Sequence, residues 1–213
     1  MSIARMQQVL TNTYARQVVV RLPRIPAHVQ PSHLAEVARR LVQGLARRGS
    51  GRIGVVVDQS LRDMAEYRWE NENTLAIPSS NFPSSTDDEA LLVHEAVHAF
   101  QDIQQRRLQW DTHEMLAYVA QMAYDIRRVP SHGSRDESYW LHTQTLPENI
   151  RQGVGSELTQ NWARSIAFRL RAGEIPTPAQ MQGLRLAILR DPTYSRMARR
   201  SGGRATVVEM DGV

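Results

Sequence analysis

The chain has 213 residues, of which 41% are hydrophobic and 23% charged, a composition typical of a globular protein with a substantial core. It contains no cysteine, which excludes disulfides and zinc sites built on thiolates. Its net charge is +4 and all 26 basic residues are arginine, but they are dispersed and no nucleic-acid-binding motif accompanies them, so we expect no specific nucleic-acid partner.

The first part of the chain predicts short strands and one helix. Residues 18–22, 52–58 and 73–78 are short runs rich in β-branched and aliphatic side chains, which is typical of strands. A helix is predicted over residues 33–48, where apolar residues recur with helical spacing. The strand at 73–78 directly precedes the next helix, and we expect it to be the edge on which an extended peptide lies as an added strand.

The next helix carries an H-E-x-x-H motif at His94, Glu95 and His98. A capping box at Thr86–Glu89 predicts its start, and the apolar pattern runs to about Arg107. Residues four apart share a helix face, so the two imidazoles can bind one zinc ion while the glutamate takes a proton from a water molecule. Such a motif is expected by chance only about 0.01 times in a chain of this composition. The alternative is that both histidines are partly exposed or pair with nearby carboxylates.

A following helix, predicted from about residue 110, offers the third ligand that a catalytic zinc ion needs. Glu114 lies in its first turn, and a short link would let the two helices pack as an antiparallel pair. His113 is the competing ligand, and Glu114 also stands where a capping residue three positions after Asp111 would stand. Asp102, one turn after His98, is interpreted as a partner that orients an imidazole.

Together these two segments, over about residues 86–128, resemble zinc metallopeptidases of the gluzincin type. The resemblance implies that His94, His98 and Glu114 bind Zn²⁺ and that Glu95 is the general base. It also implies a zincin-like core, in which a small sheet lies beside the motif helix. Hydrolysis of peptide bonds in a peptide or protein substrate is the implied activity.

Two positions depart from the family pattern. An aspartate often follows the ligand glutamate by four residues, but Tyr118 stands there, and the interval after His98 is short for the best-known members. The mechanism also calls for a donor that stabilises the oxyanion. Residues that could supply it are Tyr118, Tyr124, His132, Tyr139 and His142.

The remainder predicts helices at residues 156–171 and 177–190, then a mobile tail at 199–213. We therefore expect one mostly helical α+β domain over residues 1–213. Short H-E-x-x-H domains occur in bacterial proteins and toxin-associated peptidases, so one alternative is a bacterial toxin or effector peptidase. Another is a non-catalytic binding module that keeps zinc for stability. The sequence leaves the oligomeric state open.

No run approaches the ~20 apolar residues that span a bilayer, and the first ten residues lack the apolar centre of a secretory signal. The expected location is therefore the cytoplasm, or outside the cell by a route that needs no leader.

Overall fold

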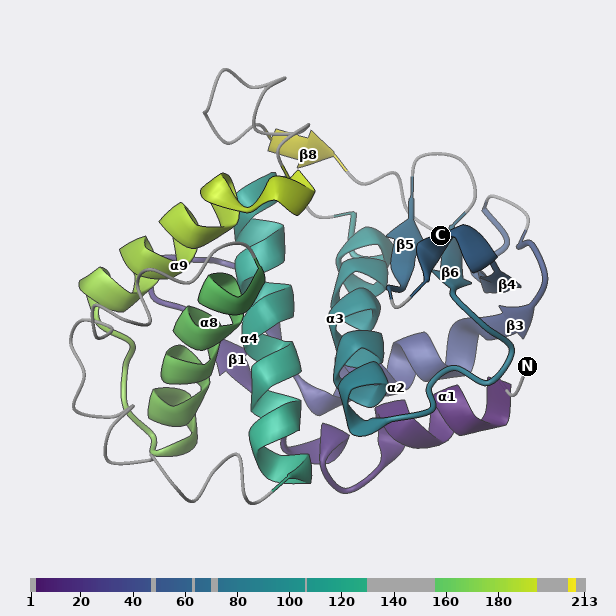
Figure 1. The fold of residues 1–213 in the computed structure, drawn as a ribbon, viewed down its shortest axis with the longest axis horizontal. Coiled ribbons are helices and arrows are strands. Elements are labelled where there is room, and N and C mark those ends of the chain that lie inside the picture. The colour runs from purple at the N-terminus through teal and green to yellow at the C-terminus, as the bar shows by residue number, and fades with distance from the viewer. Residues whose placement is uncertain are drawn as a thin grey trace. The chain divides into compact units, whose positions relative to one another are not determined.

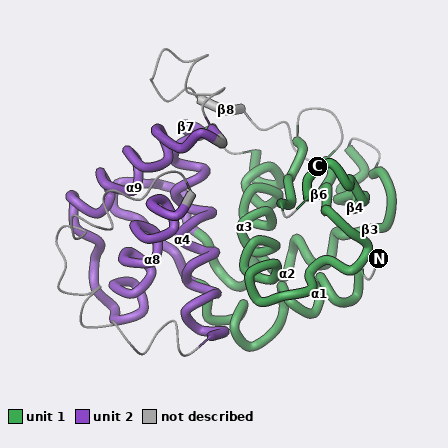
Figure 2. The backbone as a smooth tube through the Cα atoms, in the orientation of Figure 1, with its two compact units in different colours: residues 1–18, 29–107, 209–213 green, residues 19–28, 108–208 purple. Residues whose placement is uncertain are grey.

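The computed structural model describes residues 3–46, 49–62, 64–69, 73–105, 107–129, 156–194 and 207–209 (Figure 1). The predicted class is confirmed at the coarse level, because the described chain is mostly helical with small sheets. The backbone forms two compact units, which Figure 2 shows in green and purple. Unit 1 comprises residues 1–18, 29–107 and 209–213, and unit 2 comprises residues 19–28 and 108–208. The single domain over 1–213 stays a prediction, and most of the tail at 199–213 lies outside the described residues.

Unit 1 contains a four-stranded sheet in the order β3-β4-β6-β5. Its strands are β3 (Leu41–Gln43), β4 (Ile53–Val57), β5 (Glu66–Arg68) and β6 (Thr74–Ile77). The first three in spatial order run parallel, and β5 pairs antiparallel with β6 and forms an edge. The predicted edge at 73–78 is therefore wrong, because β6 has a neighbour on each side and all four of its residues are buried. The edge nearest to it in the sheet is β5.

Helices cover this sheet and complete the core of unit 1. They are α1 (Ile3–Thr11), α2 (Pro31–Arg40) and α3 (Thr86–Ile103), with the short 3₁₀ turns η1 (Ala15–Gln17) and η2 (Gln59–Leu61). The helix predicted over 33–48 ends at Arg40, because Leu41 takes an extended conformation and begins β3. The aliphatic side chains of Leu41 and Val42 fit a helical period, but pairing with β4 satisfies their backbone groups and buries Leu41.

The start of α3 is one residue earlier than its predicted capping box. Ser85 is the N-cap, its Oγ accepts from the Asp88 N–H, and the Asp88 carboxylate accepts from the Ser85 N–H. The first turn therefore satisfies backbone donors that would otherwise lack a partner in the helix. Beyond it, Leu92, Val93 and Val97 are fully buried, which fixes the orientation of α3 in the core of unit 1.

Unit 2 is built mainly from helices. They are α4 (Trp110–Arg128), α8 (Ser156–Arg171), α9 (Pro178–Arg190) and the 3₁₀ turn η3 (Pro192–Tyr194), and the short strands outside the larger sheet are β1 (Val20–Arg21), β2 (His28–Val29), β7 (Arg107–Gln109) and β8 (Val207–Glu209). The helices predicted at 156–171 and 177–190 are confirmed, with Thr177 as the N-cap of α9. Gly183 lets α9 approach α8 closely, since a Cβ there would overlap the Trp162 ring.

None of the helices in the described part of the chain combines the length and apolar character that crossing a bilayer requires.

Candidate metal centre

The motif histidines lie one turn apart in the middle of α3, and both are buried. Their Nε2 atoms are 3.2 Å apart, and the rings meet edge to face with centroids 4.9 Å apart. Two nitrogens bound to one tetrahedral zinc ion at the usual bond lengths would be about 3.3 Å apart. The helix therefore already holds Nε2 of His94 and Nε2 of His98 at a spacing that one metal ion can bridge.

The other ring nitrogen of His98 has a partner on the same helix. Its Nδ1 lies 3.4 Å from Oε1 of Gln101, which favours the tautomer with the proton on Nδ1 and the lone pair on Nε2. A metal ligand needs that lone pair. Asp102, fully buried one residue later, accepts a hydrogen bond from the Tyr67 hydroxyl at 2.6 Å. The orienting role expected for Asp102 stays a prediction, and Gln101 is a partner that sequence reasoning missed.

Glu95, the motif glutamate, is held by the edge strand. Its Oε2 accepts the backbone N–H of Tyr67 at 2.8 Å, and the residue is buried. Tyr67 therefore joins β5 to α3 at two points, through its N–H to Glu95 and its O–H to Asp102. No sequence signal marked Tyr67, because both contacts connect residues about 30 positions apart, and a local sequence pattern does not report contacts at that distance.

We expect the Tyr67 hydroxyl to stabilise unit 1 measurably. Tyr67→Phe leaves the buried Asp102 carboxylate without that donor, which should lower the free energy of unfolding by about 1–3 kcal/mol. Urea denaturation of Tyr67→Phe, Asp102→Ala and the double variant measures this. Since the two groups share one bond, the double variant should lose less than the sum of the single losses. Strict additivity would show that the bond contributes nothing to stability.

Glu114 is positioned within unit 2 by tyrosine hydroxyls. Its Oε2 accepts the Tyr194 hydroxyl at 2.7 Å, and the Tyr194 oxygen lies 3.2 Å from the Tyr118 hydroxyl. Burial raises the pKa of Tyr194 well above its usual range, and the negative charge of Glu114 raises it further. Tyr194 therefore stays protonated and donates to the carboxylate. It comes from η3, 80 residues after Glu114, so no local pattern could have revealed it.

The capping interpretation of Glu114 is wrong. The N-cap of α4 is Gln109, which makes no side-chain capping bond, so Asp111 is already the second residue of the helix. Asp111 instead accepts from Nε of Arg185 at 2.6 Å. Glu114, which is 9% exposed as a whole residue, is thus not needed to close the helix end.

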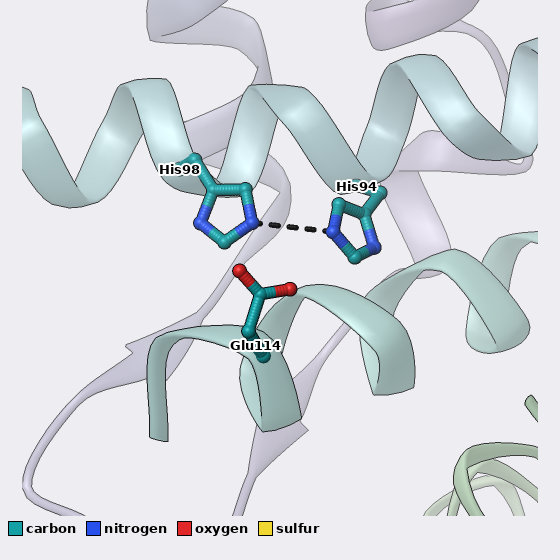
Figure 3. A group of neighbouring side chains, drawn as sticks. All are labelled: His94, His98 and Glu114. Carbon is teal, nitrogen blue, oxygen red and sulfur yellow. Dashed lines mark hydrogen bonds between the residues drawn. The ribbon is translucent and has the colours of Figure 1, made fainter. Parts of the chain in front are cut away.

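The structure brings together three of the residues that the sequence singled out. The ligand atoms of His94, His98 and Glu114 all lie within 4.8 Å of one another and form a group that could hold a metal ion (Figure 3). His113 is buried in α4 and is not a member of this group. Two nitrogens and a carboxylate oxygen are a donor set that suits zinc.

The residues considered for stabilising an oxyanion divide into two sets. Tyr118 lies beside Tyr194 and is 7% exposed, whereas Tyr124 is fully buried in α4. His132, Tyr139 and His142 lie outside the described residues. The assignment of this role stays a prediction, and Tyr118 is the member of the expected set whose hydroxyl is joined to the hydrogen bonds around Glu114.

Comparison with profiles of known protein families, with curated proteins and with solved structures finds no match.

Proposed function

We propose that the protein is a zinc-dependent peptidase of the gluzincin type, with His94, His98 and Glu114 as ligands and Glu95 as general base. The observation that carries the proposal is the 3.2 Å separation of the two Nε2 atoms on the helix that also holds Glu95. In the structure the two Nε2 atoms share a hydrogen bond, and one metal ion could take the place of that shared proton and bind both nitrogens.

A zinc ion bound there supplies a Lewis acid that activates water and polarises a carbonyl group. Glu95 is adjacent to His94 on α3 but turned about 100° around the helix, so it does not join the imidazoles as a ligand. Its carboxylate accepts the proton of the attacking water and passes it to the leaving amine. The Tyr67 N–H holds Oε2 of Glu95 in place while the carboxylate is charged.

The edge strand β5 supports a peptide as the substrate class. The Tyr67 N–H donates to Glu95 on α3, while β5 pairs on its other side with β6. Because the Tyr67 N–H is already donated to Glu95, an extended peptide beside the general base would have to pair with the other backbone groups of this strand edge. In this proposal a substrate lies along β5, and its scissile carbonyl approaches the motif helix.

Bound metal provides the direct test of the ligand set. Purified protein should hold one zinc ion per chain by mass spectrometry, and His94→Ala and His98→Ala should each reduce it to a small fraction, because each removes one of three bonds. Glu114→Ala should weaken binding, whereas His113→Ala should leave the stoichiometry unchanged.

His28→Ala is the matched control, since His28 lies at β2 and outside the proposed ligand set. Far-UV circular dichroism on each variant establishes that the helices persist, so a lost ion reports on ligands and not on unfolding. Full zinc content in both motif variants would contradict the site. Loss in His113→Ala with retention in Glu114→Ala would instead make His113 the third ligand.

A further inference from the structure

Unit 2 contains a cavity that the proposed peptidase chemistry does not use. Its volume is about 490 Å³, within the range of pockets that take small organic ligands. The turn at Pro23–Ile25, the first turns of α4, and α9 with the residues that precede it form its walls. On α4 the lining residues Thr112 and Met115 share one side, and Glu114 projects from another side of the same helix. The cavity is therefore separate from the Glu114 carboxylate.

The walls are mainly apolar. Ile25, Met115 and Met181 line it together with three prolines and Ile175, which is 76% exposed. Covering an isoleucine that is exposed to this extent with a ligand is favourable, because it removes apolar surface from water. Methionine side chains adapt their shape to a bound apolar group at small cost. The cavity thus fits an apolar body.

One cation at the cavity is held in a fixed orientation. Nε of Arg185 donates to Asp111 Oδ2 at 2.6 Å, and its Nη2 donates to Gln109 Oε1 at 3.1 Å. Asp111 is fully buried, so this pair anchors the guanidinium to α4. Neither bond uses Nη1, which leaves that group for a ligand.

A second cation comes from the turn before β2. Arg24 is the third residue of a turn closed by the Ile25 N–H on the Leu22 carbonyl, and its φ is 63°. Glycine or asparagine usually takes that position, so an arginine there is retained against a conformational cost. The Arg24 side chain is exposed and lines the cavity.

The charges select the ligand class. Among the described residues that line the cavity, two are arginines and none is a carboxylate. Asp111 neutralises Arg185 from behind, so Arg24 leaves a net charge of about +1 for a ligand to balance. We propose that this pocket binds an apolar group that ends in a single carboxylate, with the carboxylate between Arg24 and Nη1 of Arg185. A polyphosphate or a cation does not fit this balance.

Isothermal titration calorimetry with the full chain tests the proposal, using decanoate as the probe. Decanoate should bind, whereas decanol, which lacks the charge, and acetate, which lacks the apolar body, should bind at least about tenfold more weakly. Arg24→Gln should weaken decanoate binding at least about tenfold. Arg190→Gln is the matched control, because Arg190 is an exposed arginine of α9 outside the pocket and its loss should change nothing.

The same chemistry occurs in free amphiphilic acids and at the carboxyl end of a peptide, so a second probe separates them. N-acetyl-leucyl-leucine is compared with its C-terminal amide. If decanoate alone binds, the ligand is a free amphiphilic acid. If the dipeptide acid binds and its amide does not, the ligand is the carboxyl end of a peptide. No binding by either acid, equal binding of decanol and decanoate, or equal effects of Arg24→Gln and Arg190→Gln would overturn the proposal. Because the pocket lies apart from Glu114, chelator-treated protein should give the same result.

Discussion

Glu95→Gln should abolish most hydrolysis while leaving the zinc ion and the fold in place. The amide oxygen of glutamine can still accept the Tyr67 N–H, so the contact that holds residue 95 against β5 survives. What glutamine cannot do is accept a proton from water. Loss of a general base is expected to lower the rate by about 10²–10⁴-fold.

The substrate is found first by incubating the wild-type protein with a peptide library from a digested proteome and identifying cleaved products by mass spectrometry. The rate on one cleaved peptide is then compared between wild type and Glu95→Gln, with zinc content measured in the same samples. Glu89→Gln is the matched control, since Glu89 lies in the first turn of the same helix and outside the motif. If Glu95→Gln with full zinc cleaves as fast as wild type, the proposed mechanism is wrong.

This experiment distinguishes the two peptidase hypotheses from the hypothesis of a non-catalytic binding module. A peptidase, whether housekeeping or toxin, loses turnover in Glu95→Gln. A module that keeps zinc for stability shows no turnover in either protein, and its zinc content is nevertheless sensitive to His94→Ala. The buried position of Glu95 and its bond to Tyr67 are compatible with both hypotheses, so turnover decides between them.

The motif helix was predictable because its signals are local. The capping residues, the apolar spacing and the two histidines four positions apart all lie within α3. Even so, the predicted N-cap, Thr86, is one residue too late. Serine and threonine are both favourable N-caps, and in the structure Ser85 takes this position.

Where the structure differs from the local sequence pattern, pairing with another strand is the cause. Residues 41–43 continue the helical period of α2, but β4 pairs with them and turns them into a strand. The same reason explains why the predicted edge at β6 is wrong. Its own sequence reads as a strand, but only the pairing of β5 with it, through Tyr67 opposite Leu75, shows that it lies inside the sheet.

The residues that hold the proposed general base and the proposed third ligand could not be predicted from the sequence for the same reason. Tyr67 reaches Glu95 across 28 positions, and Tyr194 reaches Glu114 across 80. Neither residue belongs to a periodic pattern or a motif, so nothing in its own neighbourhood signals the contact. A sequence motif predicts which groups react, whereas the residues that hold those groups in place are determined by the tertiary fold.

Removing zinc should lower the thermal stability of the protein by a large and specific amount. The proposed ligands come from α3 and α4, so an ion bound by all three residues stabilises the native chain relative to the unfolded chain, in which the ligands are scattered. A ligand present at 100 times its dissociation constant adds about 2.7 kcal/mol. For a chain of this size, that corresponds to a rise in the melting midpoint of about 5–10 °C.

Differential scanning calorimetry of the zinc-loaded protein, before and after treatment with a chelator and with zinc content verified, measures the shift. His98→Ala supplies the control, because a variant that cannot hold the ion should melt at one temperature with or without chelator. Glu95→Gln should show the full wild-type shift, since it keeps all three ligands. An unshifted midpoint after verified loss of zinc would mean that the ion does not bind α3 and α4 together, and the assignment of Glu114 as the third ligand would then fall even if both histidines remain ligands.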